Sequence, residues 1–270
     1  MKKLFRFFLI LFAAAILVGG YARFIEPNLL RVSRQKVSTA GKTEPLTAVF
    51  FTDTHFGSQY SPRNLAKIAE KINAQNPDLV FFGGDFFDAY WQDADLLDLD
   101  MIAEELSKIQ APLGKYAVWG NHDRGGGAFR VYESVLAKGG FTVLSNQWVP
   151  VPDNDLTIAG VDDALLGSPS LNLEGAPPEA FTILLSHEPD LIAELPMEGI
   201  DLVLSGHSHG GQVTLPFLTE KILPPGSQRF YKGWYAWGQA DLFVSSGIGT
   251  TKLPVRLGNV PEIYVLELTP

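Results

Sequence analysis

Beyond residue 45 the chain repeats one pattern, a short apolar run that ends abruptly in polar residues. Five such runs are each followed by a turn rich in Gly, Ser, Asp, Asn or Thr: Leu46–Thr52, Asp78–Phe82, Tyr116–Trp119, Phe181–Leu185 and Asp201–Leu204. Continuous apolar runs of this length are typical of strands that are buried on both faces of a sheet. The pattern therefore predicts a buried sheet whose strands end in polar turns.

Segments with a helical spacing of apolar residues lie between several of these runs. Pro62–Gln75 follows Ser61, a cap residue, and starts with proline at the first helical position; Ala94–Ile109 and Ala128–Lys138 have a similar period. Three later segments are typical of strands: Gln212–Leu215, Asp241–Ser245 and Glu262–Leu268. Between the first two lies an irregular stretch, Pro216–Gly238. This order predicts an α/β fold of two packed mixed β-sheets flanked by helices.

The first residues have a different pattern. Lys2, Lys3 and Arg6 precede an uncharged, mostly apolar run over Phe7–Ala22, which is slightly shorter than the roughly 20 residues that span bilayer hydrocarbon. Two interpretations fit this run, an uncleaved signal anchor and a secretory peptide cleaved after the small residues of Gly20–Ala22. An amphipathic surface helix fits poorly, because the run has no polar face.

We therefore divide the chain into an apolar membrane anchor or signal segment over residues 1–22, a basic linker over 23–44 and one folded domain over 45–270. A length of 270 residues is near the upper limit for a single hydrophobic core. The 46% of hydrophobic residues exclude disordered, collagen-like and coiled-coil proteins. The absence of cysteine excludes a disulfide scaffold, a thiolate nucleophile and a zinc ribbon.

Charge is unevenly distributed along the chain. The formal net charge is -9, but residues 1–42 carry eight Lys and Arg against Glu26 alone, a balance of +7 that leaves -16 for residues 43–270. An acidic domain argues against extended nucleic-acid binding, whereas the basic leader favours contact with anionic lipid. Basic residues on both sides of the apolar run leave its orientation in a membrane open.

All histidines of the chain occupy one kind of position, directly after an apolar run in a short polar turn and outside the predicted helices: His55, His122, His187, His207 and His209. Asp53, Asp85 and Asn121 occupy the same kind of position. Ligands of α/β sheets collect at the carboxyl ends of the strands, so we expect these side chains on one rim. Each alone would be a turn residue, but their shared location favours a functional site.

Imidazole, carboxylate and amide groups without sulfur suit divalent Mn, Fe, Zn or Co. They are more numerous than one tetrahedral site can accept, which predicts two metal ions that share a carboxylate. Two such ions bring a charge of +4, and Asp53 and Asp85 bring -2. The positive surplus favours an anionic phosphoryl substrate over a neutral amide.

Five blocks of the chain resemble, in order, the signature of the calcineurin-like metallophosphoesterases: Asp53-x-His55, Gly84-Asp85, Gly120-Asn121-His122-Asp123, His187 and Gly206-His207-Ser208-His209. Leu185–Asp190, Ser205–Gln212 and Gly247–Thr250 are similar to a bacterial, membrane-anchored phosphodiesterase branch. The resemblance covers about residues 46–268 and implies an α/β/β/α sandwich. The chain departs from the pattern at Arg124, where many relatives have histidine.

The resemblance also implies a role for each site residue. One metal would be held by Asp53, His55 and His209, the second by Asn121, His187 and His207, and Asp85 would bridge them. Manganese is the expected ion, with Fe, Zn or Co as alternatives, and the nucleophile would be a hydroxide that bridges the metals. His122 would protonate the leaving oxygen or stabilise the transition state. Asp123 would either orient His122 or form the turn, and both roles stay open.

The sequence thus predicts a dimetal-dependent phosphoesterase that hydrolyses phosphodiester or pyrophosphate-type bonds. Its substrate would be a phosphodiester-containing small molecule or a lipid-linked, cell-envelope compound. The N-terminal segment would hold it at a bacterial membrane, with the catalytic domain extracytoplasmic and the cytoplasmic side as the alternative. Two other classes remain: a catalytically silent, metal-bound scaffold of the same fold and a metal-dependent amidase. The complete ligand set argues against the first and the charge surplus against the second.

Overall fold

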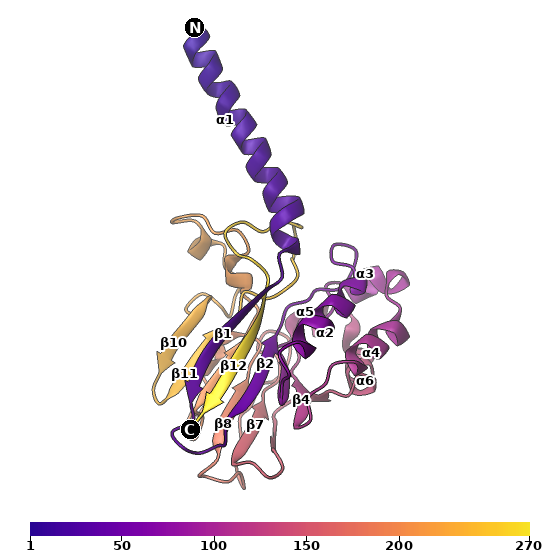
Figure 1. Cartoon of the computed structure of the whole chain (residues 1–270), viewed down its shortest axis with the longest axis vertical. Helices are drawn as coiled ribbons and strands as arrows, with labels where there is room; N and C mark the ends of the chain where they lie inside the picture. The colour runs from indigo at the N-terminus through magenta and orange to yellow at the C-terminus, as the bar shows by residue number, and fades with distance from the viewer.

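Two six-stranded mixed β-sheets pack face to face in the computed structural model, which describes residues 1–270 (Figure 1). The first sheet has the order β1-β12-β2-β3-β4-β5. Its strands are β1 (Arg31–Ser38), β2 (Leu46–Phe51), β3 (Leu79–Phe82), β4 (Gly114–Ala117), β5 (Thr142–Val143) and β12 (Glu262–Thr269). The second sheet has the order β10-β11-β9-β8-β7-β6. Its strands are β6 (Gln147–Pro150), β7 (Leu156–Gly160), β8 (Phe181–Leu185), β9 (Leu202–Ser205), β10 (Gly233–Trp237) and β11 (Ala240–Val244).

Alternate residues of the central strands face two different hydrophobic layers. Phe50 of β2 and Phe81 of β3 point into the core between the sheets, where they meet Phe243. Phe51 and Phe82 point to the opposite face and pack beneath helices. The covering helices are α2 (Leu65–Asn73), α4 (Leu99–Ser107) and α6 (Tyr132–Lys138). Because both faces of these strands are buried, their sequences are continuously apolar instead of alternating.

The outer face of the second sheet is covered by a 3-10 helix (Pro189–Ala193) and by loops, with Leu191, Ile192 and Phe230 packed against it. The predicted fold class of two mixed sheets with helices outside is therefore confirmed, although only the first sheet carries a layer of α-helices.

Three of the predicted elements differ in the structure. The helix predicted over 94–109 is interrupted: α3 (Tyr90–Asp93) and a 3-10 turn precede α4, whose start is fixed by Asp98 accepting a hydrogen bond from the Met101 N–H at 3.0 Å. The strand predicted over 212–215 is reduced to one bridge between Val213 and Leu257, since Gln212 has a left-handed φ of 51°. The stretch predicted as irregular contains β10, which pairs with β11.

The segment predicted as a basic linker also differs, because Arg31–Ser38 forms an edge strand of the first sheet. β1 pairs in parallel with β12 over its whole length, and Arg31 forms an ion pair with Glu262 at 2.9 Å. One face of an edge strand is solvent-exposed, so its polar composition resembles that of a connector. The two-sheet domain therefore begins before residue 45.

An apolar helix, α1 (Lys2–Gly20), projects from the end of the domain and buries none of its residues (Figure 1). With its continuation to Asn28 it forms the one helix that is long and apolar enough to cross a membrane. The base of this helix is attached to the domain: the Ala22 carbonyl accepts from the Arg256 N–H at 2.9 Å, and the buried Glu26 carboxylate accepts from the Asn259 N–H at 2.5 Å. Only Leu29 and Leu30 lie between this helical segment and β1.

Candidate metal centre

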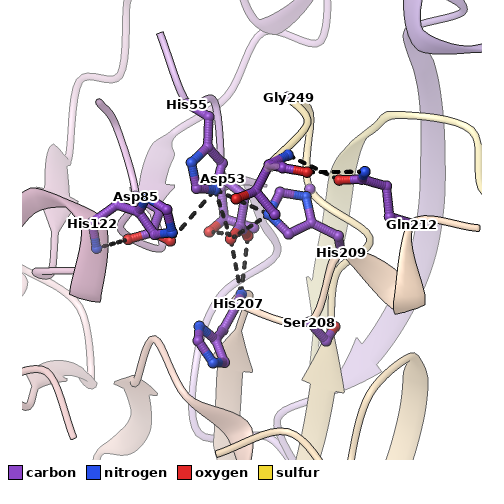
Figure 2. Close-up of polar contacts among 12 residues, drawn as sticks. Asp53, His55, Asp85, His122, His207, Ser208, His209, Gln212 and Gly249 are labelled. Atoms are coloured by element: carbon purple, nitrogen blue, oxygen red, sulfur yellow. Dashed lines mark hydrogen bonds and ion pairs between the residues drawn. The ribbon is translucent and has the colours of Figure 1, made fainter. Parts of the chain in front are cut away.

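The polar turns that follow the central strands of both sheets meet at one end of the molecule. Figure 2 shows Asp53 and Asp85 from the first sheet opposite His207 and His209 from the second, with His55 above them. All eight chemically active positions expected on this rim lie there: Asp53, His55, Asp85, Asn121, His122, His187, His207 and His209. One expectation differs, since His122 lies in a short helix, α5 (Asn121–Gly125), and not in a turn.

The first group of possible metal ligands consists of Asp53, His55 and His209, all buried, whose ligand atoms lie within 4.8 Å of one another. Asp53 Oδ1 is 3.9 Å from His55 Nε2 and 3.6 Å from His209 Nε2, and the two imidazole nitrogens are 3.0 Å apart. Two carboxylate-facing ring nitrogens at this separation form a compact donor set of the kind that binds a divalent cation.

The second group consists of Asp85, His187 and His207, which are also buried. His187 Nδ1 lies 2.7 Å from the Gly83 carbonyl, and His207 Nε2 lies 2.8 Å from that of Pro225. Each carbonyl accepts a hydrogen bond from the ring nitrogen that faces it, so the other nitrogen of each ring is the one that can coordinate a cation when the ring is neutral.

Asp85 connects the two groups. Its Oδ2 is 3.4 Å from His55 Nε2 and 3.2 Å from His187 Nε2. Its Oδ1 accepts from the His122 N–H at 2.8 Å, which holds the carboxylate in place. A single carboxylate oxygen therefore lies within reach of both groups.

Two buried atoms test whether this site fits metal ions. Asn121 Oδ1 is shielded from solvent and makes no hydrogen bond, and the equally shielded His187 Nε2 faces Asp85 Oδ2 at 3.2 Å without hydrogen-bond geometry. Buried polar atoms without a partner are rare and destabilising unless an ion or water satisfies them. Their presence in a sulfur-free set of imidazole, carboxylate and amide donors fits two divalent cations.

His122 lies at the mouth of this site and is held by a residue that sequence reasoning missed. Its Nδ1 is 2.8 Å from the Asp88 carbonyl oxygen and 3.2 Å from Asp88 Oδ1. The same Oδ1 is 3.2 Å from His55 Nδ1. Asp88 therefore orients both imidazoles, and its position three residues after Asp85, beyond two phenylalanines, was the available signal in the sequence.

The Asp123 carboxylate does not have the contacts that would be needed to orient the His122 ring. This carboxylate is fully buried and makes no hydrogen bond to the His122 ring. It accepts hydrogen bonds from four backbone N–H groups, those of Asp85 at 2.8 Å, Phe86 at 3.0 Å, Phe87 at 3.1 Å and Gly120 at 3.2 Å. Of the two roles left open, these contacts favour that of a turn former that fixes the loop carrying Asp85.

We expect Asp123→Ala to lower the free energy of unfolding by roughly 3 kcal/mol or more, because each backbone donor left buried without an acceptor costs about 1–3 kcal/mol. Denaturant unfolding followed by circular dichroism measures this. Asp100→Ala, at an exposed helix position, is the control and should change stability by less than about 0.5 kcal/mol. An Asp123→Ala protein as stable as its control would contradict the role of Asp123 in fixing the loop that carries Asp85.

The electrostatics of the site favour charged carboxylates beside imidazoles of mixed protonation. Burial alone would raise the pKa of Asp85, but the charges of His187 and His122 outweigh it and hold that pKa well below its usual range. Burial also disfavours protonation of His122, yet the charge of Asp85 and the hydrogen bond to Asp88 raise its pKa. Burial, reinforced by the charge of His187, lowers the pKa of His207 to about 4.

A cavity of about 460 Å³ opens over this centre. Its floor contains Asp85, Asn121 and His122 along with His207 and His209. Its wall has an apolar part, formed by Leu165, Val213, Ile222, Pro224, Pro225, Leu253 and Val255, and a polar part, formed by Ser208, Gln212, Thr251 and Lys252. This volume is within the range of small-molecule sites. Arg124 does not line it, because its guanidinium stacks on Trp119 at 4.5 Å and pairs with Asp162.

Residues 46–211 match the family model described as Calcineurin-like phosphoesterase. The metallophosphoesterase YkuE of Bacillus subtilis is 35% identical to the chain, over 95% of this chain and 92% of that protein. The phosphodiesterase YaeI of Escherichia coli is 30% identical over 92% of each chain. A UDP-2,3-diacylglucosamine pyrophosphatase of Chlamydia trachomatis, LpxG, is 28% identical over 94% of each.

Proposed function

Because the chain belongs to the calcineurin-like phosphoesterase family, and is thus a metal-dependent phosphoric ester hydrolase, we propose that it uses two divalent ions to hydrolyse phosphodiester or pyrophosphate-type bonds. The observation that carries this proposal is the position of Asp85 Oδ2, 3.4 Å from an imidazole of one ligand group and 3.2 Å from an imidazole of the other. One shared carboxylate is what a pair of neighbouring cations requires.

The two groups indicate which residues would hold the ions. Asp53, His55 and His209 would hold one, Asn121, His187 and His207 the other, and Asp85 would contact both. Manganese suits this donor set, as do Fe, Zn and Co. When bound, two such ions supply Lewis acidity, which lowers the pKa of water and neutralises phosphoryl charge.

The chain's own contribution to bond cleavage is the proton on His122. Its Nδ1 faces the carbonyl and carboxylate of Asp88, so its Nε2 is the nitrogen available to a substrate in the cavity. Without bound ions, the charge of Asp85 and the hydrogen bonds to Asp88 raise the pKa of His122, and Asp88 would still face the ring when Asp85 contacts the ions. His122 would donate that proton to the leaving oxygen, and Asp88 would hold the ring in position.

Charge and shape indicate the substrate class. Two divalent ions exceed the charge of Asp53 and Asp85, and an anionic phosphoryl group would balance the surplus. The apolar wall of the cavity supports a substrate with a lipid part, and one relative is named for a diacylated sugar nucleotide. We therefore propose a lipid-linked or cell-envelope phosphodiester or pyrophosphate.

We further propose that α1 anchors the protein in a bacterial membrane with the catalytic domain outside the cytoplasm. The hydropathy and full exposure of α1 support anchoring, and the basic start of the chain supports export of the domain that is attached to the helix. Digestion of the domain by protease in lysed cells but not in intact spheroplasts would overturn the extracytoplasmic placement.

The reaction class is tested by incubating the full-length protein with Mn²⁺ and three chromogenic substrates: bis(p-nitrophenyl) phosphate, p-nitrophenyl phosphate and a p-nitroanilide. We expect turnover of the diester and none of the anilide, with the chelator-treated protein as control. Activity on the anilide alone would favour an amidase. Inactivity on every phosphoester would favour a catalytically silent scaffold.

A further inference from the structure

The anchor helix and the substrate cavity share one loop of the domain. Arg256 and Asn259 hold the base of the anchor through their backbone N–H groups, which donate to Ala22 and Glu26. A few residues earlier in the same loop, Thr251, Lys252 and Leu253 line the cavity. The cavity mouth is therefore fixed close to the end of α1.

A second segment at this mouth exposes large apolar side chains. Within residues 215–222, the exposed fractions are 40% for Leu215, 90% for Phe217, 52% for Leu218 and 64% for Ile222, and Leu253 of the anchor-bound loop is 64% exposed. Four exposed apolar side chains of this size within eight residues are a local concentration that often marks a binding surface. We call these five residues the apolar rim.

The segment that carries four of the rim residues is joined to the anchor-bound loop through Gln212, three residues before Leu215. The Gln212 side chain donates to the carbonyls of Thr251 at 3.1 Å and Leu253 at 2.9 Å, and accepts from the Thr251 N–H at 2.9 Å. Figure 2 shows Gln212 joined by such bonds beside His209 and Gly249. The patch is thus positioned by the same loop that carries the helix base.

The whole assembly lies at the end of the domain from which α1 projects. In Figure 1 the orange loop between β9 and β10 lies beside the lower end of α1, and the loops at the amino ends of β7 and β8 lie at the opposite end. Exposed charged residues next to these segments in the sequence are Lys221 and Glu220 beside Ile222 and Lys252 beside Leu253, and Arg23 is exposed at the base of the helix. Aromatic and aliphatic side chains bordered by cations are typical of surfaces that contact anionic bilayers.

We propose that the apolar rim inserts into the headgroup region of the bilayer that anchors α1, as a second membrane contact, so that the cavity opens against the lipid surface. The proposal rests on membrane anchoring by α1 and deepens the proposed function. The phosphoryl group that is cleaved would belong to a lipid. This lipid would enter from the bilayer, with its acyl part along Ile222 and Leu253. The alternative occupant of the apolar rim is a second protein. Strong lipid quenching at the rim would exclude this alternative, and its absence would favour it.

The absence of cysteine in the chain permits a direct test with single labelled cysteines. Full-length Phe217→Cys and a control, Asp155→Cys in the exposed turn at the far end of the domain, are labelled with an environment-sensitive fluorophore. Both are reconstituted in phosphatidylethanolamine and phosphatidylglycerol vesicles containing a nitroxide lipid. Interfacial side chains insert about 5–10 Å, so we expect quenching at 217 to exceed that at 155 roughly threefold or more. Equal quenching at both positions would overturn the proposal.

A second variant tests the consequence for catalysis. Phe217 and Leu218 do not line the cavity, so Phe217→Asn with Leu218→Gln should hydrolyse soluble bis(p-nitrophenyl) phosphate at the unaltered rate. Asparagine suits position 217 because its φ is +64°. On phosphatidyl-p-nitrophenol in vesicles we expect a loss of about tenfold, since the surface that positions the lipid is removed.

The two experiments separate this proposal from the proposed function. Unchanged hydrolysis of the vesicle substrate by the double variant would overturn the membrane contact while leaving phosphoesterase activity intact. Failure of the unaltered protein to cleave either phosphodiester would instead reject the proposed function, and the fluorescence result would still decide whether the rim meets lipid.

Discussion

Asp85→Asn is expected to lower kcat/KM for phosphodiesters by at least about 10³-fold and to reduce the bound metal content. The carboxylate is within 3.4 Å of imidazoles in both ligand groups, and only one other buried carboxylate, Asp53, belongs to them. Its neutralisation therefore weakens both cation sites together. Metal catalysis contributes several kcal/mol, and about 1.36 kcal/mol corresponds to a factor of ten in rate.

Metal content by plasma mass spectrometry and steady-state kinetics measure both effects. Asp155→Asn, at an exposed turn remote from the site, is the control and should match the unaltered protein in each. Chelation of the unaltered protein should abolish turnover, and Mn²⁺ should restore it. An Asp85→Asn protein with full metal content and full turnover would contradict the shared role of this residue.

His122→Ala is expected to reduce turnover of alkyl phosphodiesters by about 10²–10⁴-fold, the usual range for loss of a general acid, and to leave the metal content unchanged. The residue lines the cavity, and its imidazole is 31% exposed, unlike the buried imidazoles of the ligand groups. Its Nδ1 is occupied by Asp88. Removing the ring therefore removes a proton donor but no atom of the two ligand groups.

The leaving group distinguishes proton donation from other roles of His122. A p-nitrophenolate departs without a proton, so His122→Ala should impair cleavage of p-nitrophenyl esters far less than that of alkyl diesters, whose alkoxide needs one. An equal loss on both substrates would indicate that His122 stabilises the transition state by binding. Loss of metal in the variant would mean that it is a ligand.

The positions of the candidate site residues could be predicted because parallel strands carry them. Asp53, Asp85 and His187 each follow a strand that is buried on both faces, and such strands are recognisable as continuous apolar runs. The carboxyl ends of β2 and β3, and of β8 and β9, then bring the turns to one rim without any knowledge of long-range contacts.

Which of two nearby carboxylates positions the His122 ring could not be decided from the sequence, for a physical reason. Asp88 and Asp123 are both carboxylates close to site residues in the sequence, and which of them contacts the His122 ring depends on the direction of α5. The first turn of that helix points Asp123 back under the Asp85 loop, which leaves Asp88 beside the imidazole. Local propensity does not determine such an orientation.

Strand β1 could not be predicted because its stability comes from a partner more than 200 residues away in the chain. Its polar sequence pairs in register with β12, for example Arg31 with Glu262. β-propensity is context-dependent and low for such residues, and the pairing strand appears only at the end of the chain. The same holds for β10, whose aromatic residues lie within the stretch predicted as irregular.

The near-continuous path from α1 into β1, with only Leu29 and Leu30 between them, has a consequence for how the protein finds its substrate. A flexible tether lets a catalytic domain sweep a volume whose radius grows with the length of the tether. With α1 anchored as proposed, the domain would have no slack, and its candidate metal centre would stay at a constant height above the bilayer. The search for a lipid-linked substrate would then be two-dimensional, and the surface density of that substrate would set its effective concentration.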